Sequence, residues 1–187
     1  MAKRENGVEE ELMPLRKRPS LRPPQQQVEE LPERFKNKIM EMRGTEERLI
    51  FKRKLTKSDV DKGASRLSIP MSELLSHSFL TSDEKEKAEN LVKEGREGRG
   101  LTVQVIDPRL RVWELKLRRV VMEKRETNKG KRGNPSSSYW LGYKWNYVVK
   151  TNSLREGNDF QLWSFRSQQK LCLALVLLRG EGRSLGN

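Results

Sequence analysis

Two polar stretches of this sequence hold side chains whose types suit the binding of a charged ligand. The first, LTKSDVDKGASRLSIP at residues 55–70, mixes lysines and an arginine with hydroxyls. The second, EKRETNKGKRGNPSSS at residues 123–138, contains no hydrophobic residue. Lysine and arginine offer charge to phosphates, hydroxyls offer short hydrogen-bond donors, and asparagine can pair with base edges. The candidate binding residues are Lys54, Thr56, Lys57, Ser58, Arg66, Lys129, Lys131, Arg132, Asn134, Ser136, Ser137 and Ser138.

Each of these residues also has a simpler interpretation, as part of a solvated surface loop. Thr56, Ser58 and Asp59 would suit a capped helical turn, since their side-chain oxygens accept free backbone N–H groups. Arg66 could contact a ligand, or it could pair with Asp59 and only hold the loop. The gathering of charge into two clusters favours binding over a chance arrangement.

The charge balance indicates a polyanionic partner. The 187 residues carry a net charge of +13, with 39 lysines and arginines against 26 acidic residues. The excess is uneven, because residues 101–150 hold 12 basic and 4 acidic residues, whereas residues 1–50 hold 11 and 10. Such focusing is typical of a nucleic-acid-binding surface, with an anionic membrane surface as the weaker alternative.

Cysteine and histidine are too few for the sites that would indicate an enzyme. Cys172 is the single cysteine and His77 the single histidine, which excludes an internal disulfide and a zinc finger within one chain. Cys172 lies in the apolar run LCLALVLL, where a buried thiol is expected. His77 has no serine or cysteine partner at a suggestive spacing. We therefore expect no enzyme activity, no metal or cofactor, and no small-molecule substrate.

Targeting signals favour the nucleus over a membrane or secretion. The run LCLALVLL is far shorter than the roughly 20 apolar residues that cross a bilayer. The N-terminal sequence has no apolar region of the kind found in secretory signals, so we expect a soluble, intracellular protein without a membrane partner. Residues 16–19, RKRP, are a short match to a nuclear import signal.

Helices are predicted before and inside the main domain. Residues 1–27, with RPPQQQ, should be disordered, and residues 28–48 should hold a flanking amphipathic helix between Pro32 and Gly44. Further helices are expected over residues 71–80 and over 81–92, where Thr81 and Glu84 fit a capping box. The charged run DEKEKAE in the second of these should face solvent. One or two helical turns are predicted over residues 146–154.

Alternation of apolar and polar residues predicts about seven strands. In residues 101–107, LTVQVID, the apolar positions should face inward. Residues 170–178, KLCLALVLL, are apolar on both faces and should form a central strand. The other predicted strands are residues 49–55, 66–70, 112–117, 139–145 and 160–165. This pattern predicts a mainly β domain over residues 49–178, a small, mostly antiparallel barrel or sandwich with short helical insertions.

Local features of these strands give further expectations. Leu49, Phe51 and Leu55 should share one face of the first strand. Arg118 and Arg119 interrupt the alternation of the fourth, as a bulge would. A flexible connection is expected at residues 95–100 and a loose tail at 179–187. Three tryptophans are expected in the core rather than in a base-stacking platform: Trp113, Trp145 and Trp163.

Four stretches resemble the plant B3-type DNA-binding domain, in particular a plant-specific subgroup once described as a domain of unknown function. They are LTKSDV…RLSIP, FLTSDEK, YWLGYKWNYVVKTNSL and FQLWSFR…LCLALVLL. The last is the most specific, because Leu-Trp-Ser-Phe-Arg before an apolar strand rarely arises by chance. The resemblance implies a seven-stranded open pseudobarrel with two short helices, here preceded by the N-terminal helix.

The resemblance also implies how such a domain binds double-stranded DNA. Two loops, an N-arm after the first strand and a C-arm between the fourth and fifth strands, enter the major groove. Residues 54–66 match the N-arm, and the polar loop ending in NPSSSY matches the C-arm. The chain departs from the usual pattern at Val120, where a tryptophan is usual, at Lys144, where glycine is common, and at Asn158, where aspartate is expected.

Two classes of function remain open from the sequence. The first is sequence-specific double-stranded DNA binding in transcription regulation. The second is a module on the same scaffold that binds nucleic acid without sequence preference or binds another protein.

Overall fold

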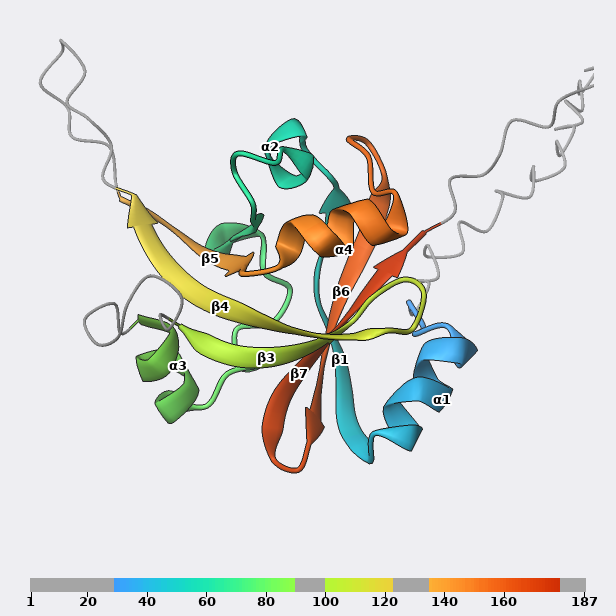
Figure 1. The fold of residues 1–187 in the computed structure, drawn as a ribbon. Helices are drawn as coiled ribbons and strands as arrows, with labels where there is room; N and C mark the ends of the chain where they lie inside the picture. Colours follow the sequence, from blue (N-terminus) through green and yellow to red (C-terminus); the bar gives the residue numbers. More distant parts are fainter. Residues whose placement is uncertain (1–28, 90–99, 123–134, 179–187) are drawn as a thin grey trace, which may run out of the picture.

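One curved sheet organises the part of the chain that the computed structural model describes, residues 29–89, 100–122 and 135–178. These residues form seven strands in the order β1-β6-β7-β3-β4-β5-β2 (Figure 1). The strands are β1 (Gly44–Lys54), β2 (Leu67–Pro70), β3 (Leu101–Ile106), β4 (Val112–Met122), β5 (Ser136–Gly142), β6 (Asp159–Ser167) and β7 (Lys170–Leu177). All neighbouring pairs are antiparallel except β3 and β7. The prediction of a mainly β, seven-stranded open fold is confirmed.

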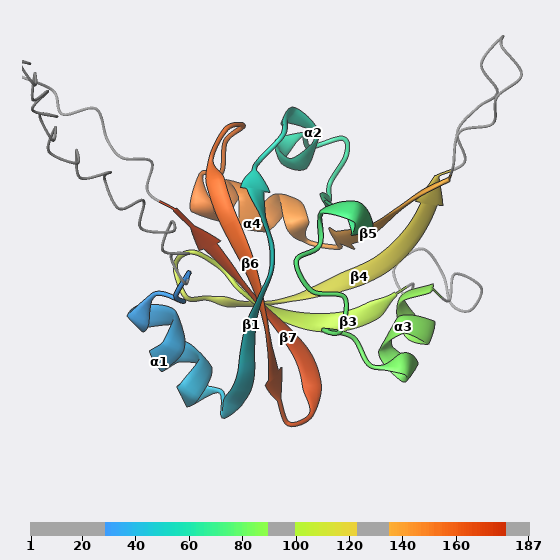
Figure 2. The same ribbon diagram turned by 180° about the vertical axis from the view of Figure 1, so that it is seen from behind.

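Side-chain alternation divides the buried residues into a barrel interior and a second cluster outside it. Along β3, Val103 and Val105 are buried, whereas Thr102 and Gln104 are exposed, as predicted. β7 is buried from Leu171 through Val176, because the barrel interior covers one face and the second cluster the other. The second cluster joins β6 and β7 to the helix α1 (Glu33–Glu41), which lies beside β1 (Figure 2).

The predicted roles of several core residues are confirmed. Trp145 is fully buried in the barrel interior, Trp163 is buried in the second cluster, and Trp113 is half-buried against the interior. Cys172 is buried, and burial raises the pKa of its thiol, as expected for a packing residue rather than a nucleophile.

The structure corrects three expectations about strands. A register shift between Leu49 and Phe51 places Leu49 against the second cluster and Phe51 in the barrel interior, so these residues do not share a face. β1 also begins at Gly44, inside the segment predicted to be a flanking helix. The predicted bulge at Arg118 and Arg119 is wrong, because β4 pairs with β5 in unbroken register there.

The helices are short and connect the strands. α3 begins with the predicted capping box, in which the Thr81 backbone N–H donates to Glu84 Oε2 (2.9 Å) and the Glu84 N–H donates to Thr81 Oγ1 (3.3 Å). Besides α1, the described helices are α2 (Lys57–Val60), α3 (Ser82–Glu89) and α4 (Trp145–Asn152), with a 3₁₀ turn at Met71–Glu73. The 3₁₀ turn is all that forms of the helix predicted over residues 71–80.

Hydrogen bonds to β1 explain why residues after Glu73 leave the helix. The Leu75 N–H donates to the Ile50 carbonyl (2.9 Å), and Arg48 donates to the hydroxyl of Ser78 (2.5 Å). Serine side chains that find partners of this kind compete with helical backbone bonding. The segment therefore follows the edge of β1 instead of continuing as a helix.

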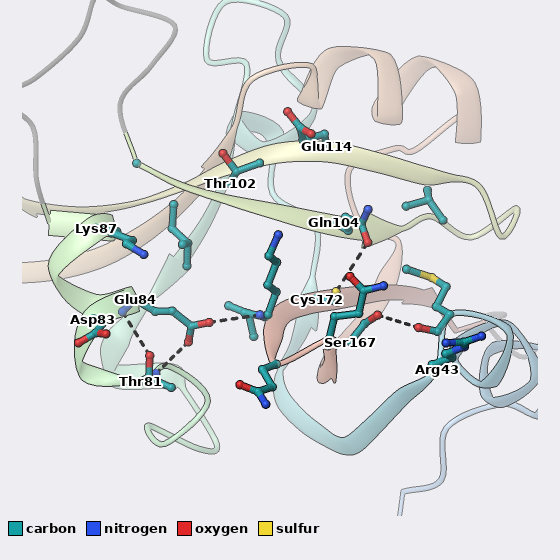
Figure 3. Close-up of a pocket in the computed structure, with 18 of the residues that line it drawn as sticks. Arg43, Thr81, Asp83, Glu84, Lys87, Thr102, Gln104, Glu114, Ser167 and Cys172 are labelled. Atoms are coloured by element: carbon teal, nitrogen blue, oxygen red, sulfur yellow. Dashed lines mark hydrogen bonds between the residues drawn. The ribbon is translucent and has the colours of Figure 1, made fainter.

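Glu84 corrects the expectation that all charged residues of α3 face solvent. Residues Gln104–Ile106 of β3 pair with Cys172–Ala174 of β7, and before that point the two parallel strands diverge. The Glu84 carboxylate occupies this divergence, where it accepts hydrogen bonds from the Leu171 N–H (3.2 Å; Figure 3) and from Arg166 (2.6 Å). Glu84 thus supplies the partner that a neighbouring strand would give to the Leu171 N–H.

The environment of Glu84 lowers its pKa. Burial alone would raise the pKa, because it disfavours the charged form. The hydrogen bonds from Arg166, Thr81 and Leu171, with the positive charge of Arg166, outweigh that cost and leave the pKa below the ordinary 4.5.

Several expectations fall outside the described residues. They concern the disordered segment at residues 1–27 with its RKRP motif, most of the connection at 95–100, and the tail at 179–187.

Candidate nucleic-acid interface

The loop between β1 and β2, which matches the N-arm, is organised around one buried carboxylate. Asp59 is fully buried and accepts hydrogen bonds from the Thr56 N–H (2.8 Å) and the Thr56 hydroxyl (2.7 Å). It also accepts from the Ser68 N–H (3.1 Å) and pairs with Arg53 (2.9 Å). The first turn of α2 is therefore a capping box, and this loop has a fixed shape.

The same residues join the two edge strands of the open barrel. β1 and β2 lie at opposite ends of the strand order, so the barrel is open between them. Arg53 on β1 donates to the Ser68 carbonyl on β2 (2.6 Å) while it pairs with Asp59. Side chains rather than a strand ladder thus link the edges at this point, directly beneath the N-arm.

Helix α4 supports the N-arm from inside the domain. The buried Trp145 donates from its indole N–H to the Asp59 carbonyl (2.7 Å). Asn146 donates to the Lys62 carbonyl (3.0 Å), near the tip of the loop. Both bonds hold backbone atoms, so they fix the path of the loop and leave its charged side chains available.

The N-arm presents its predicted cations to solvent. Lys54 and Lys57 are exposed, as are Thr56 and Ser58. The Thr56 hydroxyl is engaged with Asp59 and lies 3.0 Å from Ser58 Oγ, so its role here is the capping role that the sequence had left open. Lysines on a fixed loop can meet phosphates without a large ordering cost.

Arg66 does not pair with Asp59, which corrects one interpretation of the sequence. Its guanidinium carbon lies 3.9 Å from the centroid of the Trp140 ring, and its Nη1 donates to the Ala64 carbonyl (3.3 Å). The Asp59 carboxylate is instead occupied by Arg53. Arg66 is half-exposed, at the junction of the N-arm and β2.

The predicted C-arm residues are only partly described. Lys129, Lys131, Arg132 and Asn134 lie outside the described residues. The three serines belong to β5 and pair with the end of β4: Ser136 with Met122, Ser137 with Val121, and Ser138 with Val120. Ser136 is exposed, Ser137 is half-buried and Ser138 is buried, so Ser136 is the best placed of the three for an external contact.

The two candidate regions lie toward the same side of the domain. In Figures 1 and 2, α2 and the paired outer ends of β4 and β5 both extend toward the top of the view. A rod-like ligand on this side could contact the N-arm and the paired outer ends of β4 and β5 together.

Sequence reasoning missed Arg53 and Trp140. For Arg53 no local signal exists, because its partners Asp59 and Ser68 lie on other elements. For Trp140 a signal was present: Tyr139 and Leu141 are buried neighbours on β5, so alternation turns Trp140 outward.

A groove of about 1110 Å³ lies away from the N-arm, between α3, β3 and the β6–β7 turn (Figure 3). Its lining mixes acidic and basic side chains, so it lacks the net positive charge that a polyanion requires. The charged lining residues are Glu41, Asp83, Glu84, Glu114, Arg43, Lys87 and Lys170.

Among the described residues, no three histidine, cysteine, aspartate or glutamate side chains are grouped so that they could hold a metal ion. The helices in these same segments are all too short or too polar to cross a membrane.

Comparison with known proteins decides the family. The family described as "B3 domain-containing protein At2g31720-like" matches residues 27–179. The chain belongs to the B3 domain family. Relatives from Arabidopsis thaliana include B3 domain-containing protein At5g38490, 37% identical over 131 residues, and B3 domain-containing protein At3g25182, 35% identical over 160 residues.

The similarity to these relatives is confined to part of each. The matched region covers 68% of this chain and 34% of At5g38490, and 85% of this chain and 44% of At3g25182. This B3 chain thus spans less than half the length of either relative. A solved structure, the Arabidopsis FUS3-DNA complex, is 18% identical with a TM-score of 0.38, covering 72% of this chain and 100% of that chain. At that TM-score the likeness supports no inference about this chain.

The structure explains why glycine is common at one of the positions where this B3 domain departs from the usual pattern, and why asparagine can replace aspartate at another. Lys144 has a φ of 64°, in the left-handed region where glycine is least strained, so glycine would fit there without strain. The Asn158 Oδ1 accepts a hydrogen bond from the Arg155 N–H (2.8 Å), a role that an aspartate oxygen could also fill.

Proposed function

We propose that this B3 domain binds double-stranded DNA sequence-specifically and acts in transcription regulation in the nucleus. The N-arm and the C-arm enter the major groove, and no catalysis is involved. The observation that carries the proposal is the N-arm itself, a loop fixed around buried Asp59 that holds Lys54 and Lys57 exposed.

The chemistry of the candidate residues supports a division of labour between the arms. The exposed N-arm lysines suit phosphates, which fix the position of a protein on DNA but carry no sequence information. Asn134, in the proposed C-arm, has an amide that can pair bidentately with adenine. The net charge of +13 adds attraction toward any nucleic acid and raises the rate of encounter.

A selection from random-sequence duplex DNA tests the proposal. Enrichment of a motif by the wild-type protein is the expected result. The matched variant is Asn134→Ala, which should lose about 1–3 kcal/mol on the selected site and relax the preference at one base pair. Selection without enrichment of any motif would contradict sequence-specific recognition.

The alternative is a module that binds nucleic acid without sequence preference or binds another protein. The strong positive charge favours nucleic acid within this alternative. Salt-sensitive binding without a motif would support a non-specific nucleic-acid binder, whereas no binding to any duplex or single-stranded nucleic acid would leave only the protein-binding module.

A further inference from the structure

Trp140 occupies an outward position on the sheet next to the N-arm. On β5 it pairs laterally with Ser68 of β2 and with Arg118 of β4, while its chain neighbours Tyr139 and Leu141 are buried. A tryptophan that only filled the core would occupy one of those buried positions. Trp140 is instead half-buried, with part of its ring covered by Arg66.

Arg66 is held in place by two different contacts. Its guanidinium carbon lies 3.9 Å from the centroid of the Trp140 ring, well inside the range of about 6 Å in which a cation is attracted to a ring face. Its Nη1 donates to the Ala64 carbonyl, at 3.3 Å. Together these contacts restrict a long side chain that would otherwise sample many rotamers.

The stacking partner suits arginine in particular. A guanidinium is planar and weakly hydrated, so it can stack on an indole and still donate hydrogen bonds from its edge. An ammonium group keeps its hydration shell and has no plane to match the ring. The stacking therefore fixes the direction in which the N–H groups of Arg66 point. An arginine that supplied only positive charge would not need a fixed orientation.

We infer that Trp140 is a positioning residue for DNA binding, which fixes the guanidinium of Arg66 in the orientation that the DNA meets. The inference rests on the proposed function and extends it to a residue outside both arms. Trp140 acts through Arg66: it reduces the ordering that Arg66 must undergo on binding.

The test is a double-mutant cycle on the wild-type protein and the variants Trp140→Leu, Arg66→Ala and the two combined, titrated against the selected duplex. Trp140→Leu should weaken binding by about 2- to 30-fold, the range that corresponds to one cation–π contact. The combined variant should bind no more weakly than Arg66→Ala alone, because Trp140 has no role once Arg66 is absent. Independent, multiplying losses would overturn the inference.

Two controls separate positioning from a structural role. Trp113→Leu removes another half-buried tryptophan, one whose indole N–H bonds Asp107, and it should leave DNA affinity unchanged. Arg66→Lys keeps the charge but loses the stacking plane, so it should weaken binding to a similar extent as Trp140→Leu, even if the Trp140 variant fails to fold. An Arg66→Lys protein with wild-type affinity would overturn the inference.

A measurement on the free protein separates the contact between Trp140 and Arg66 from the effect of that contact on DNA binding. In NMR spectra of the free protein, the Arg66 side-chain protons should be shifted upfield by the Trp140 ring and should lose this shift in Trp140→Leu. Absence of the shift, or unchanged DNA affinity in Trp140→Leu, overturns the role of Trp140 alone. Failure of the wild-type protein to bind any duplex overturns the proposed function and this inference with it.

Discussion

Replacing Asp59 by asparagine should destabilise the domain and loosen its N-arm. The change keeps the shape of the side chain but removes its charge and turns one acceptor oxygen into a donor. Both carboxylate oxygens face donors: Oδ2 accepts from Thr56, Oδ1 accepts from the Ser68 N–H, and Arg53 reaches both. Either orientation of the amide therefore points an N–H group at another donor.

The expected loss of stability follows from the burial of the ion pair between Asp59 and Arg53. The Asp59 side chain is fully buried and that of Arg53 is 16% exposed, so the substitution would leave a nearly buried guanidinium without its counter-charge. Breaking a buried ion pair by removing one partner typically costs about 3–5 kcal/mol, and the partial exposure of Arg53 favours about 3 kcal/mol.

Urea unfolding followed by tryptophan fluorescence measures this loss. The matched control is Asp61→Asn on the same loop, where the exposed carboxylate accepts from the Gly63 N–H (3.2 Å). The control should change the free energy of unfolding by less than about 0.5 kcal/mol. A loss of under about 1 kcal/mol in Asp59→Asn would show that the N-arm does not depend on this buried pair.

Three further substitutions test other parts of the domain. Lys57→Ala should weaken binding to selected and scrambled duplexes equally and reduce the slope of log affinity against log salt by about 0.9, measured by titration at several salt concentrations. Glu84 has a lowered pKa in the folded state, so its contribution to stability should be complete above pH 4.5 and should decline as the pH falls through the lowered value. In Glu84→Gln, the free energy of unfolding obtained with urea should therefore fall less between pH 5 and roughly pH 2–3 than it does in the wild-type protein. An unchanged pH profile would contradict this assignment. Trp163→Ala should cost about 3–5 kcal/mol in the same assay, since Trp163 is buried between β6 and α1, whereas a variant with wild-type stability and no DNA binding would contradict its core role.

Features set by neighbouring residues could be predicted from the sequence. The alternation in β3 follows from a period of two, and the capping box at Thr81 and Glu84 follows from a spacing of three. The position of β7 inside the sheet follows from its apolar residues on both faces. In each case the information lies within one element, where spacing alone determines which side chains meet.

Features that depend on partners far along the chain could not be predicted in this way. The charged run around Glu84 has the composition of a solvated helix face, and its burial depends on Arg166 from β6. Asp59 similarly looks like a loop carboxylate until the fold brings Arg53 to it. The Trp140–Arg66 contact joins β5 to the residue before β2, and only the pairing of those two strands places them together.

The link between β1 and β2 limits how new recognition loops could be transferred into this scaffold. Arg53, Asp59 and Ser68 both shape the N-arm and join the edges of the barrel, so a graft must carry all three as one unit. Length changes should be tolerated best within residues 63–65, which contribute no group to that link. An insertion between Arg53 and Asp59 would alter recognition and folding together, so designers of altered specificity should vary the outer half of the loop first.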